Sequence, residues 1–206
     1  MAISSLSKFT VPLASDQSAS TQGLLMPKLQ YRFRISFENF GVSTPTTELT
    51  KQVVDAARPS VTMENQELWV YNSRVNYAGR PKWGTLSVKL RDDVTGAVSK
   101  LVGEQVQKQF DFFEQSSAAS GGDYKFLLRI EMLDGGNGAF TPNVLETWEC
   151  YGCYLTDVKY GELTYKSQEV VLVEMTIQPD NCIEVTGGAA PPTSRPTGTL
   201  ASASGI

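Results

Sequence analysis

Alternation of apolar and polar residues is the feature that most restricts how this chain can fold. Four segments show it: 29–38, 83–91, 124–133 and 168–178. Successive side chains of a strand point to opposite faces, so a period of two predicts strands with one buried face. The residues expected to face the core are Leu29, Tyr31, Phe33, Ile35 and Phe37; Leu86, Val88 and Leu90; Tyr124, Phe126, Leu128, Ile130 and Met132; and Val171, Val173, Met175 and Ile177. A further strand is expected at about 144–158.

One segment, about 94–115, has helical spacing instead. Apolar residues recur every three or four positions, at Val94, Val98, Leu101, Val102, Val106, Phe110 and Phe113. Asp92 and Asp93 precede the segment, and either can cap the unpaired amides of a first helical turn. Several strands and one helix predict a mainly β fold, a β-barrel or sandwich, with one flanking α-helix.

Between the first two alternating segments, the runs 50–58 and 60–71 are predicted to be extended, with Pro59 between them. They are expected to form a mostly polar two-stranded ribbon, of the kind that lines water or meets a partner. The next residues, 72–82, contain Gly79 and Pro81 and are predicted to be a loop.

Composition sets the domain boundaries. Residues 1–27 and 186–206 are rich in small and polar residues and are predicted to be flexible arms, which leaves a single body at 28–185. The first nineteen residues have only Lys8 as a positive charge, so no secretory signal is predicted. No run of apolar residues is long enough for a transmembrane helix.

The residue types present exclude several kinds of chemistry. The chain has no histidine, so Ser-His-Asp and Cys-His catalysis cannot operate within it. Three cysteines, Cys150, Cys153 and Cys182, cannot by themselves complete a four-ligand zinc site. A strand is expected to put Cys150 and Cys153 on opposite faces, which would prevent a disulfide between them. We therefore predict no catalytic residues, no cofactor and no metal.

Other polar groups have a simple structural explanation. Asp92 and Asp93 are adjacent before a helix, which favours capping over a catalytic carboxylate pair. The glycine-rich run 135–138 lacks the spacing of phosphate-binding loops and is expected to be a turn. Glu162 and Glu169 are expected to lie in a solvated turn and not to form a glycosidase pair.

Basic and aromatic residues occur together around positions 69–91. Arg74, Tyr77, Arg80 and Trp83 suit either a protein interface or a platform for single-stranded nucleic acid. The formal net charge of −4 favours the interface, because nucleic-acid affinity depends on neutralising phosphates.

Three stretches together resemble the tail tube protein of contractile-tailed bacteriophages. They are 27–37; Tyr71 to Arg74, running on to Asp93; and Trp148 to Ile177. The resemblance implies hexameric rings stacked into a hollow tube, with a continuous β-sheet around a lumen through which DNA passes. It implies as partners other copies of the chain, sheath subunits, baseplate and tail terminator proteins. It also implies location in the virion tail after assembly in the host cytoplasm, with no membrane insertion.

The resemblance adds expectations for particular residues. The ribbon at 50–71 is expected to contribute Asp55, Glu64 and Glu67 to a lumen of neutral to negative potential. Basic residues, with Arg32 and Arg34 as candidates, are expected on the outer wall and at the interfaces. Two alternatives stay open. One is a tube subunit of the similar type VI secretion system, and the other is a β-sandwich module that binds carbohydrate or nucleic acid.

Overall fold

The computed structural model describes residues 28–42, 46–135, 142–166 and 168–186. The predicted arm 1–27 lies outside these ranges, as does the predicted tail beyond Thr186. The elements, in chain order, are β1 (Phe33–Glu38), α1 (Thr47–Gln52), β2 (Val53–Ala56), β3 (Val61–Val70), β4 (Ser73–Trp83), β5 (Leu86–Arg91), α2 (Ala97–Gln109), β6 (Phe110–Asp111), β7 (Ser116–Ser117), α3 (Gly121–Tyr124), β8 (Phe126–Leu133), β9 (Val144–Lys159), β10 (Leu172–Gln178) and β11 (Asn181–Thr186).

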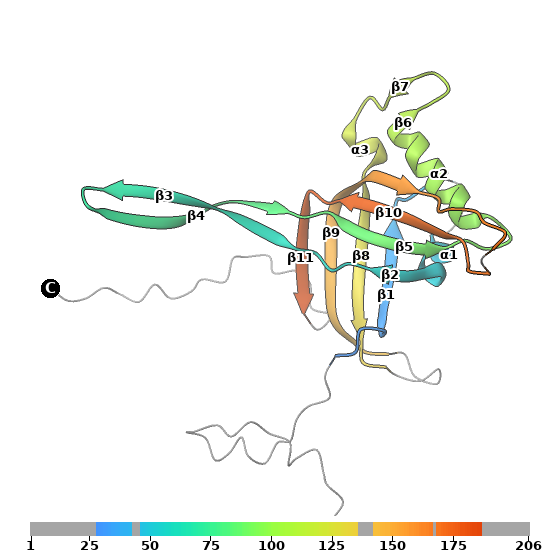
Figure 1. Ribbon diagram of the computed structural model, residues 1–206, viewed down its shortest axis with the longest axis horizontal. Helices are drawn as coiled ribbons and strands as arrows, with labels where there is room; N and C mark the ends of the chain where they lie inside the picture. The colour runs from blue at the N-terminus through green and yellow to red at the C-terminus, as the bar shows by residue number, and fades with distance from the viewer. Residues whose placement is uncertain (1–27, 43–45, 136–141, 167, 187–206) are drawn as a thin grey trace, which may run out of the picture. The chain divides into compact units, whose positions relative to one another are not determined.

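Seven strands form one antiparallel sheet in the order β1-β8-β9-β10-β5-β2, with β11 also paired to β9. The long strand β9 belongs to two layers. Its first half pairs with β8 and β11, and its second half pairs with β10. We call β1, β8, β11 and the first half of β9 the β8 layer, and β2, β5, β10 and the second half the β10 layer. Figure 1 shows the strands of the two layers crossing steeply. The predicted mainly β fold with a flanking helix is confirmed.

The core lies between the two layers and is closed by α2. Most of the residues predicted from alternation are buried there: Ile35, Phe37, Leu86, Val88, Leu90, Phe126, Leu128, Ile130, Met132, Val173, Met175 and Ile177. The first predicted strand was too long, because residues 30 and 31 form a turn and Tyr31 is 72% exposed. Two other predictions were wrong: Val171 is exposed, and Tyr124 belongs to α3.

The flanking helix is shorter than predicted. Gly96 has a φ of +65° and is the N-cap of α2, so the helix cannot include Val94, which is fully exposed. Neither aspartate is the capping residue. The Asp93 carboxylate instead accepts hydrogen bonds from the Thr95 hydroxyl and N–H, and Asp92 accepts one from Ser99.

The bend between the layers occurs at Gly152. This residue has a φ of +64°, a conformation that favours glycine, and the Asp180 N–H bonds the Tyr151 carbonyl at 3.1 Å beside it. The bend changes the alternation of side chains along β9. The prediction that Cys150 and Cys153 lie on opposite faces was therefore wrong, because both are buried in the core.

The three thiols are free and buried. Burial raises the pKa of Cys153 to about 12. Because the thiolate is the reactive form, we expect Cys153 of the native protein to react with an aromatic disulfide reagent at about pH 8 roughly a thousandfold more slowly than in urea. Equal rates would contradict this, and an intact Cys150–Cys153 disulfide in non-reducing mass spectrometry would contradict the free thiols.

Candidate assembly surface

The β3–β4 hairpin is the largest element whose side chains are not covered by the rest of the described chain. The two strands pair with each other from Val61–Trp83 to Val70–Ser73, and every residue of β3 is exposed. Figure 1 shows them side by side along their length. The run 60–71 is a strand as predicted, but its predicted pairing with 50–58 was wrong, and so was the predicted loop at 72–82. Residues 53–56 pair with β5 instead, and the run after the turn at Tyr71 and Asn72 is strand β4.

Gly79 and Pro81 suggested a loop, yet both fit within β4. The pairing register shifts between Met63 and Asn65, so β4 has an extra residue near Gly79. A bulge accepts glycine, and proline fits a strand whose ladder is irregular there.

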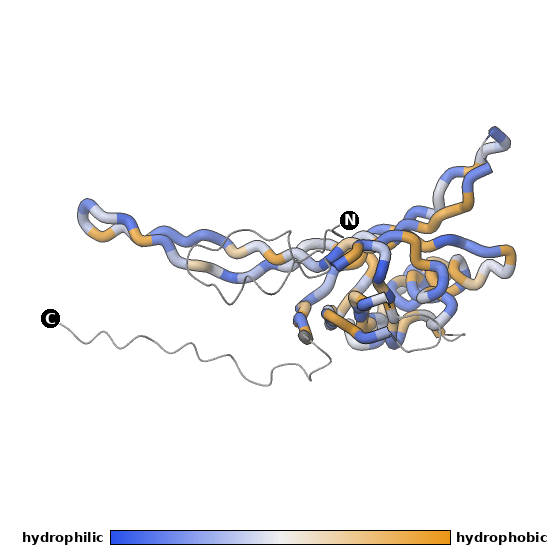
Figure 2. The backbone as a smooth tube through the Cα atoms, turned by 90° about the horizontal axis from the view of Figure 1, so that it is seen from below, coloured by the Kyte–Doolittle hydropathy of each residue, from blue (hydrophilic) through white to orange (hydrophobic). Residues whose placement is uncertain are grey.

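Both faces of the hairpin carry apolar side chains. By register, Leu68, Val70, Val75 and Tyr77 share one face, and Met63 and Trp69 lie on the other. All six are more than half exposed. Figure 2 shows apolar positions interspersed with polar ones along both strands. An isolated two-stranded hairpin is marginally stable in water, so its apolar groups favour completion by a partner.

The hairpin tip is held together by local contacts. The Arg74 guanidinium lies 5.6 Å from the Trp69 ring centroid and forms an ion pair with Glu67 at 3.3 Å. Tyr71, in the turn, is 96% exposed and has a φ of +53°. An aromatic residue is unusual in that conformation, where Asn or Gly is preferred.

The structure gathers most of the predicted site residues on this hairpin. Arg74, Tyr77 and Arg80 lie on β4, and Trp83 ends it, whereas Glu64 and Glu67 lie on β3. Asp55 is separate, on β2. The exposed tip was not predicted from the sequence. The apolar run from Leu68 to Tyr71, followed by Asn72, was a possible signal of a hairpin turn.

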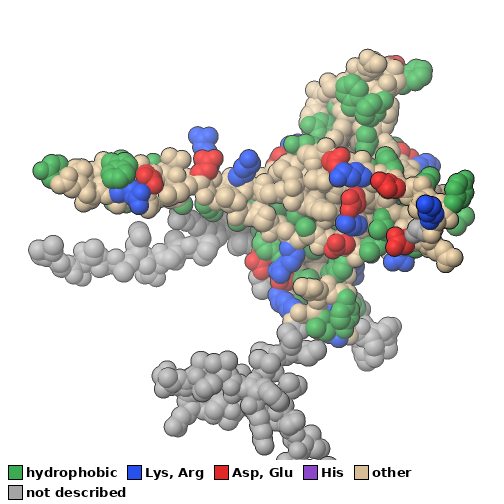
Figure 3. Space-filling view, viewed as in Figure 1, with side chains coloured by type: hydrophobic (Ala, Val, Ile, Leu, Met, Phe, Trp, Pro, Cys, Tyr) green, Lys and Arg blue, Asp and Glu red, His purple; other side chains and the backbone are tan. Residues whose placement is uncertain are grey.

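The outward face of the β10 layer carries a row of alternating charges. By register, Asp55 is opposite Lys89, Lys89 is opposite Glu174, and Glu174 is opposite Lys159. Lys89 and Glu174 form an ion pair at 2.5 Å. Figure 3 shows acidic and basic side chains interspersed over this part of the protein. The row has no excess of either sign.

No protein-family model matches the sequence, and no curated protein is similar to it in sequence. Solved structures are similar in fold. A chain of the anti-feeding prophage tube terminating cap has 14% identity and a TM-score of 0.59, covering 82% of this chain and 98% of that one. A chain of the PVC extracellular contractile injection system sheath/tube terminator has 14% identity and a TM-score of 0.56, covering 80% and 100%. A chain of the PVC sheath-tube complex has 14% identity and a TM-score of 0.54, covering 78% and 92%.

This chain has the fold of contractile injection system tube and terminator proteins. We call it the tube-protein fold. At 14% identity the likeness extends to the fold alone, and it confirms the fold that the sequence resemblance implied.

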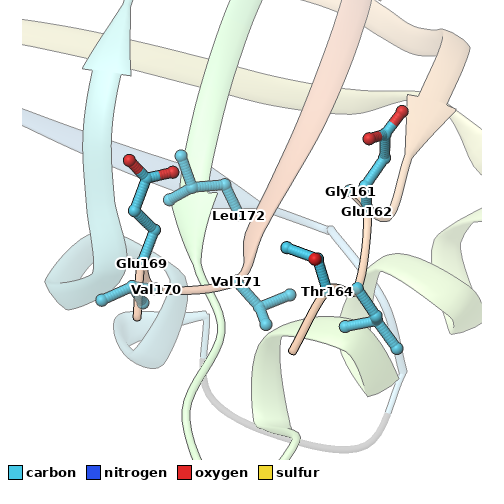
Figure 4. A pocket seen from close by; sticks show the side chains of 8 residues that line it. Gly161, Glu162, Thr164, Glu169, Val170, Val171 and Leu172 are labelled. Atoms are coloured by element: carbon cyan, nitrogen blue, oxygen red, sulfur yellow. The ribbon is translucent and has the colours of Figure 1, made fainter. Parts of the chain in front are cut away.

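Beside the sheet of this tube-protein fold, the connection from β9 to β10 lines an open pocket of about 340 Å³. Figure 4 shows Glu162 and Glu169 on opposite sides of it, with carboxylates that do not converge on one point. A glycosidase needs two carboxylates flanking one bond, so this pair does not support that chemistry. Within the described ranges, no three His, Cys, Asp or Glu side chains are placed to hold a metal ion, and no helix is long and apolar enough to cross a membrane.

The charge row gives a pH prediction. The hydrogen bond and charge of Lys89 lower the pKa of Glu174, and Glu174 in turn raises the pKa of Lys89. The contribution of Glu174 to stability is therefore present above its ordinary pKa of 4.5 and lost as the pH falls through its lower folded value. That of Lys89 is present below 10.5 and lost only above that value.

We expect Glu174→Gln to lower the melting temperature slightly at neutral pH and not at about pH 2. Thermal melts at both pH values test this, with the exposed Glu162→Gln as the control. A difference of equal size at both pH values would show that the ionised pair is not the cause.

Proposed function

We propose that this chain is the structural subunit of a hollow tail tube in a contractile machine and has no catalytic role. The observation that carries the proposal is the β3–β4 hairpin, which is exposed on both faces in a chain with the tube-protein fold. A neighbouring copy is the partner that completes it. Such a contact joins different surfaces of two copies, and contacts of this type form a ring when the rotation between successive copies closes.

The hairpin supplies the residue types that concentrate binding energy at interfaces. Trp69 and Tyr71 lie at its tip, and Arg74, Tyr77 and Arg80 follow on β4. Tyr, Trp and Arg are the commonest hot-spot residues, which supports the hairpin as the contact between subunits. Six subunits per ring, with rings stacked into a tube, are the form that the sequence resemblance implies.

In this proposal, the outward face of the β10 layer, including Asp55, lines the channel. Its alternating charges suit a conduit for DNA. DNA binds tightly where basic residues neutralise its phosphates and release their counterions, and a row without excess positive charge does this little. Glu64 and Glu67, on the hairpin, then belong to the contact between subunits and not to the lumen. Sheath, baseplate and terminator proteins are the proposed partners, and the virion tail is the proposed location.

A second candidate is a tube terminator or an injection-system tube. It is favoured by the structural similarity to a tube terminating cap and to an extracellular contractile injection system sheath/tube terminator. A terminator is expected to form single rings, whereas a tube subunit is expected to form long tubes.

Negative-stain electron microscopy of the purified full chain, at increasing concentration, tests the proposal. Long hollow tubes are expected, and single rings would favour the terminator. A protein that stays monomeric throughout would contradict both. Tight DNA binding by the assembled tubes at low salt would revive the nucleic-acid-binding alternative.

A further inference from the structure

The hairpin is the direct continuation of the β2–β5 strand pair. The Ala57 N–H bonds the Ser87 carbonyl at 2.8 Å at the end of that pair, and the Gly84 N–H bonds the Ser60 carbonyl at 2.8 Å where the hairpin begins. Between these two hydrogen bonds lie Arg58 and Pro59. Proline has no N–H to donate, so the ladder is interrupted there. An interruption of this kind is where a long hairpin can pivot.

An ion pair between an exposed arginine and a buried carboxylate lies at this interruption. Arg58 Nη2 donates to Glu146 Oε1, and the Glu146 side chain is only 3% exposed. Trp148 Nε1 donates to the same oxygen at 2.6 Å. Glu146 is the only charged residue among the buried residues of the described ranges. A buried carboxylate destabilises a protein unless it is paired and hydrogen-bonded, and the contacts with Arg58 and Trp148 compensate the burial of Glu146.

The second strand of the hairpin, β4, is held to the body by other contacts, at Trp83. Trp83 Nε1 donates to Asn181 Oδ1 at 3.2 Å, and Gln178 Nε2 donates to the Trp83 carbonyl at 3.2 Å. Arg58 is therefore tied to β9, and Trp83 is tied to the ends of β10 and β11. A single contact with the body would leave the hairpin free to rotate about that contact, whereas two separate contacts restrict its direction.

We propose that Arg58 and Glu146 are positioning residues that, together with the Trp83 contacts, fix the direction of the hairpin for docking onto the next copy. This inference rests on the proposed function, because a fixed hairpin direction matters only if the hairpin docks onto another copy. Arg58 is 55% exposed, so its removal costs little core packing, and the Trp148 side chain still donates to the Glu146 carboxylate.

The test measures the direction of the hairpin and assembly separately. Spin labels are placed on cysteines introduced at Asn72, in the turn, and at Ser87, on β5, both of which are exposed. The native thiols are buried, so the labels react with the introduced positions. Pulsed electron spin resonance on the monomer gives the distribution of distances between the labels. Assembly of the unlabelled chain is followed by sedimentation.

Arg58→Ala is expected to broaden the distance distribution at least about twofold and to raise the concentration needed for assembly at least about tenfold. Arg58→Lys is expected to restore both in large part, because it keeps the charge facing Glu146. The matched control is Arg34→Ala, which removes an ion pair with Glu131 at 2.6 Å in the β8 layer and is expected to change neither.

An unchanged distance distribution in Arg58→Ala would overturn the inference, whether or not assembly is lost. If assembly alone is lost, Arg58 contacts the neighbouring copy directly and does not fix the direction of the hairpin. If the unaltered chain does not assemble, the proposed function fails, and the monomer distances still test whether Arg58 fixes the hairpin.

Discussion

Replacing Trp69 and Tyr71 by serine is expected to abolish assembly while leaving the body of the protein folded. Their side chains are 66% and 96% exposed, so they contribute little to the core of the monomer. Aromatic residues at the centre of an interface each contribute about 2 kcal/mol or more, and the pair therefore corresponds to a roughly thousandfold rise in the concentration required for assembly.

The measurement is sedimentation and electron microscopy of the double variant, with thermal melting to confirm that it is folded. Trp69→Phe with Tyr71→Phe is the matched control, because it keeps aromatic area at both positions and is expected to assemble at a concentration within about tenfold of the unaltered chain. Normal tubes from the serine variant would show that the tip is not the contact.

The second large effect is expected at the bend between the two layers. Gly152→Ala puts a methyl group on a residue in the left-handed conformation, where the new Cβ would clash with Asp180 Oδ2 and lie 3.0 Å from Asp180 Cβ. The conformation costs about 1–2 kcal/mol and the overpacking about 1–3 kcal/mol, so we expect the free energy of unfolding to fall by about 2–5 kcal/mol.

Urea denaturation measures this change, and Gly103→Ala is its control. Gly103 lies inside α2, and a Cβ added there meets nothing within 4 Å. Alanine is the better helix former, so this variant is expected to be about 1 kcal/mol more stable. Substitutions of the same kind should thus have opposite signs, and equal effects would contradict the role given to the bend.

The strands that bury one face were predictable because the core selects every second residue. Ile35 and Phe37, or Leu128 and Ile130, alternate in sequence and are buried together in the structure. Alternation does not reveal which strands pair. The segment that contains β2 was therefore predicted to pair with the segment that contains β3, whereas β2 pairs with β5. Pairing depends on contacts between residues far apart in the chain.

The errors at Gly96 and Gly152 have a common cause. Each glycine has a positive φ, which sets the start of a helix at Gly96 and bends a strand at Gly152. A sequence shows that glycine is present, but not that its φ is positive. The candidate assembly surface was partly predictable, since Arg74, Tyr77 and Arg80 were identified by residue type. Their placement on a strand required the register with β3.

The continuity of the hairpin with β2 and β5 has a mechanical consequence. A pull on the hairpin is directed along β5, which pairs with β10 from Leu86 to Arg91. The hydrogen bonds between these strands are then loaded together, in shear, and do not open one after another as in a zipper. Loads shared in this way are resisted more strongly than loads on single bonds, so in the proposed tube tension from a neighbouring copy would pass into the sheet without unravelling it from the edge.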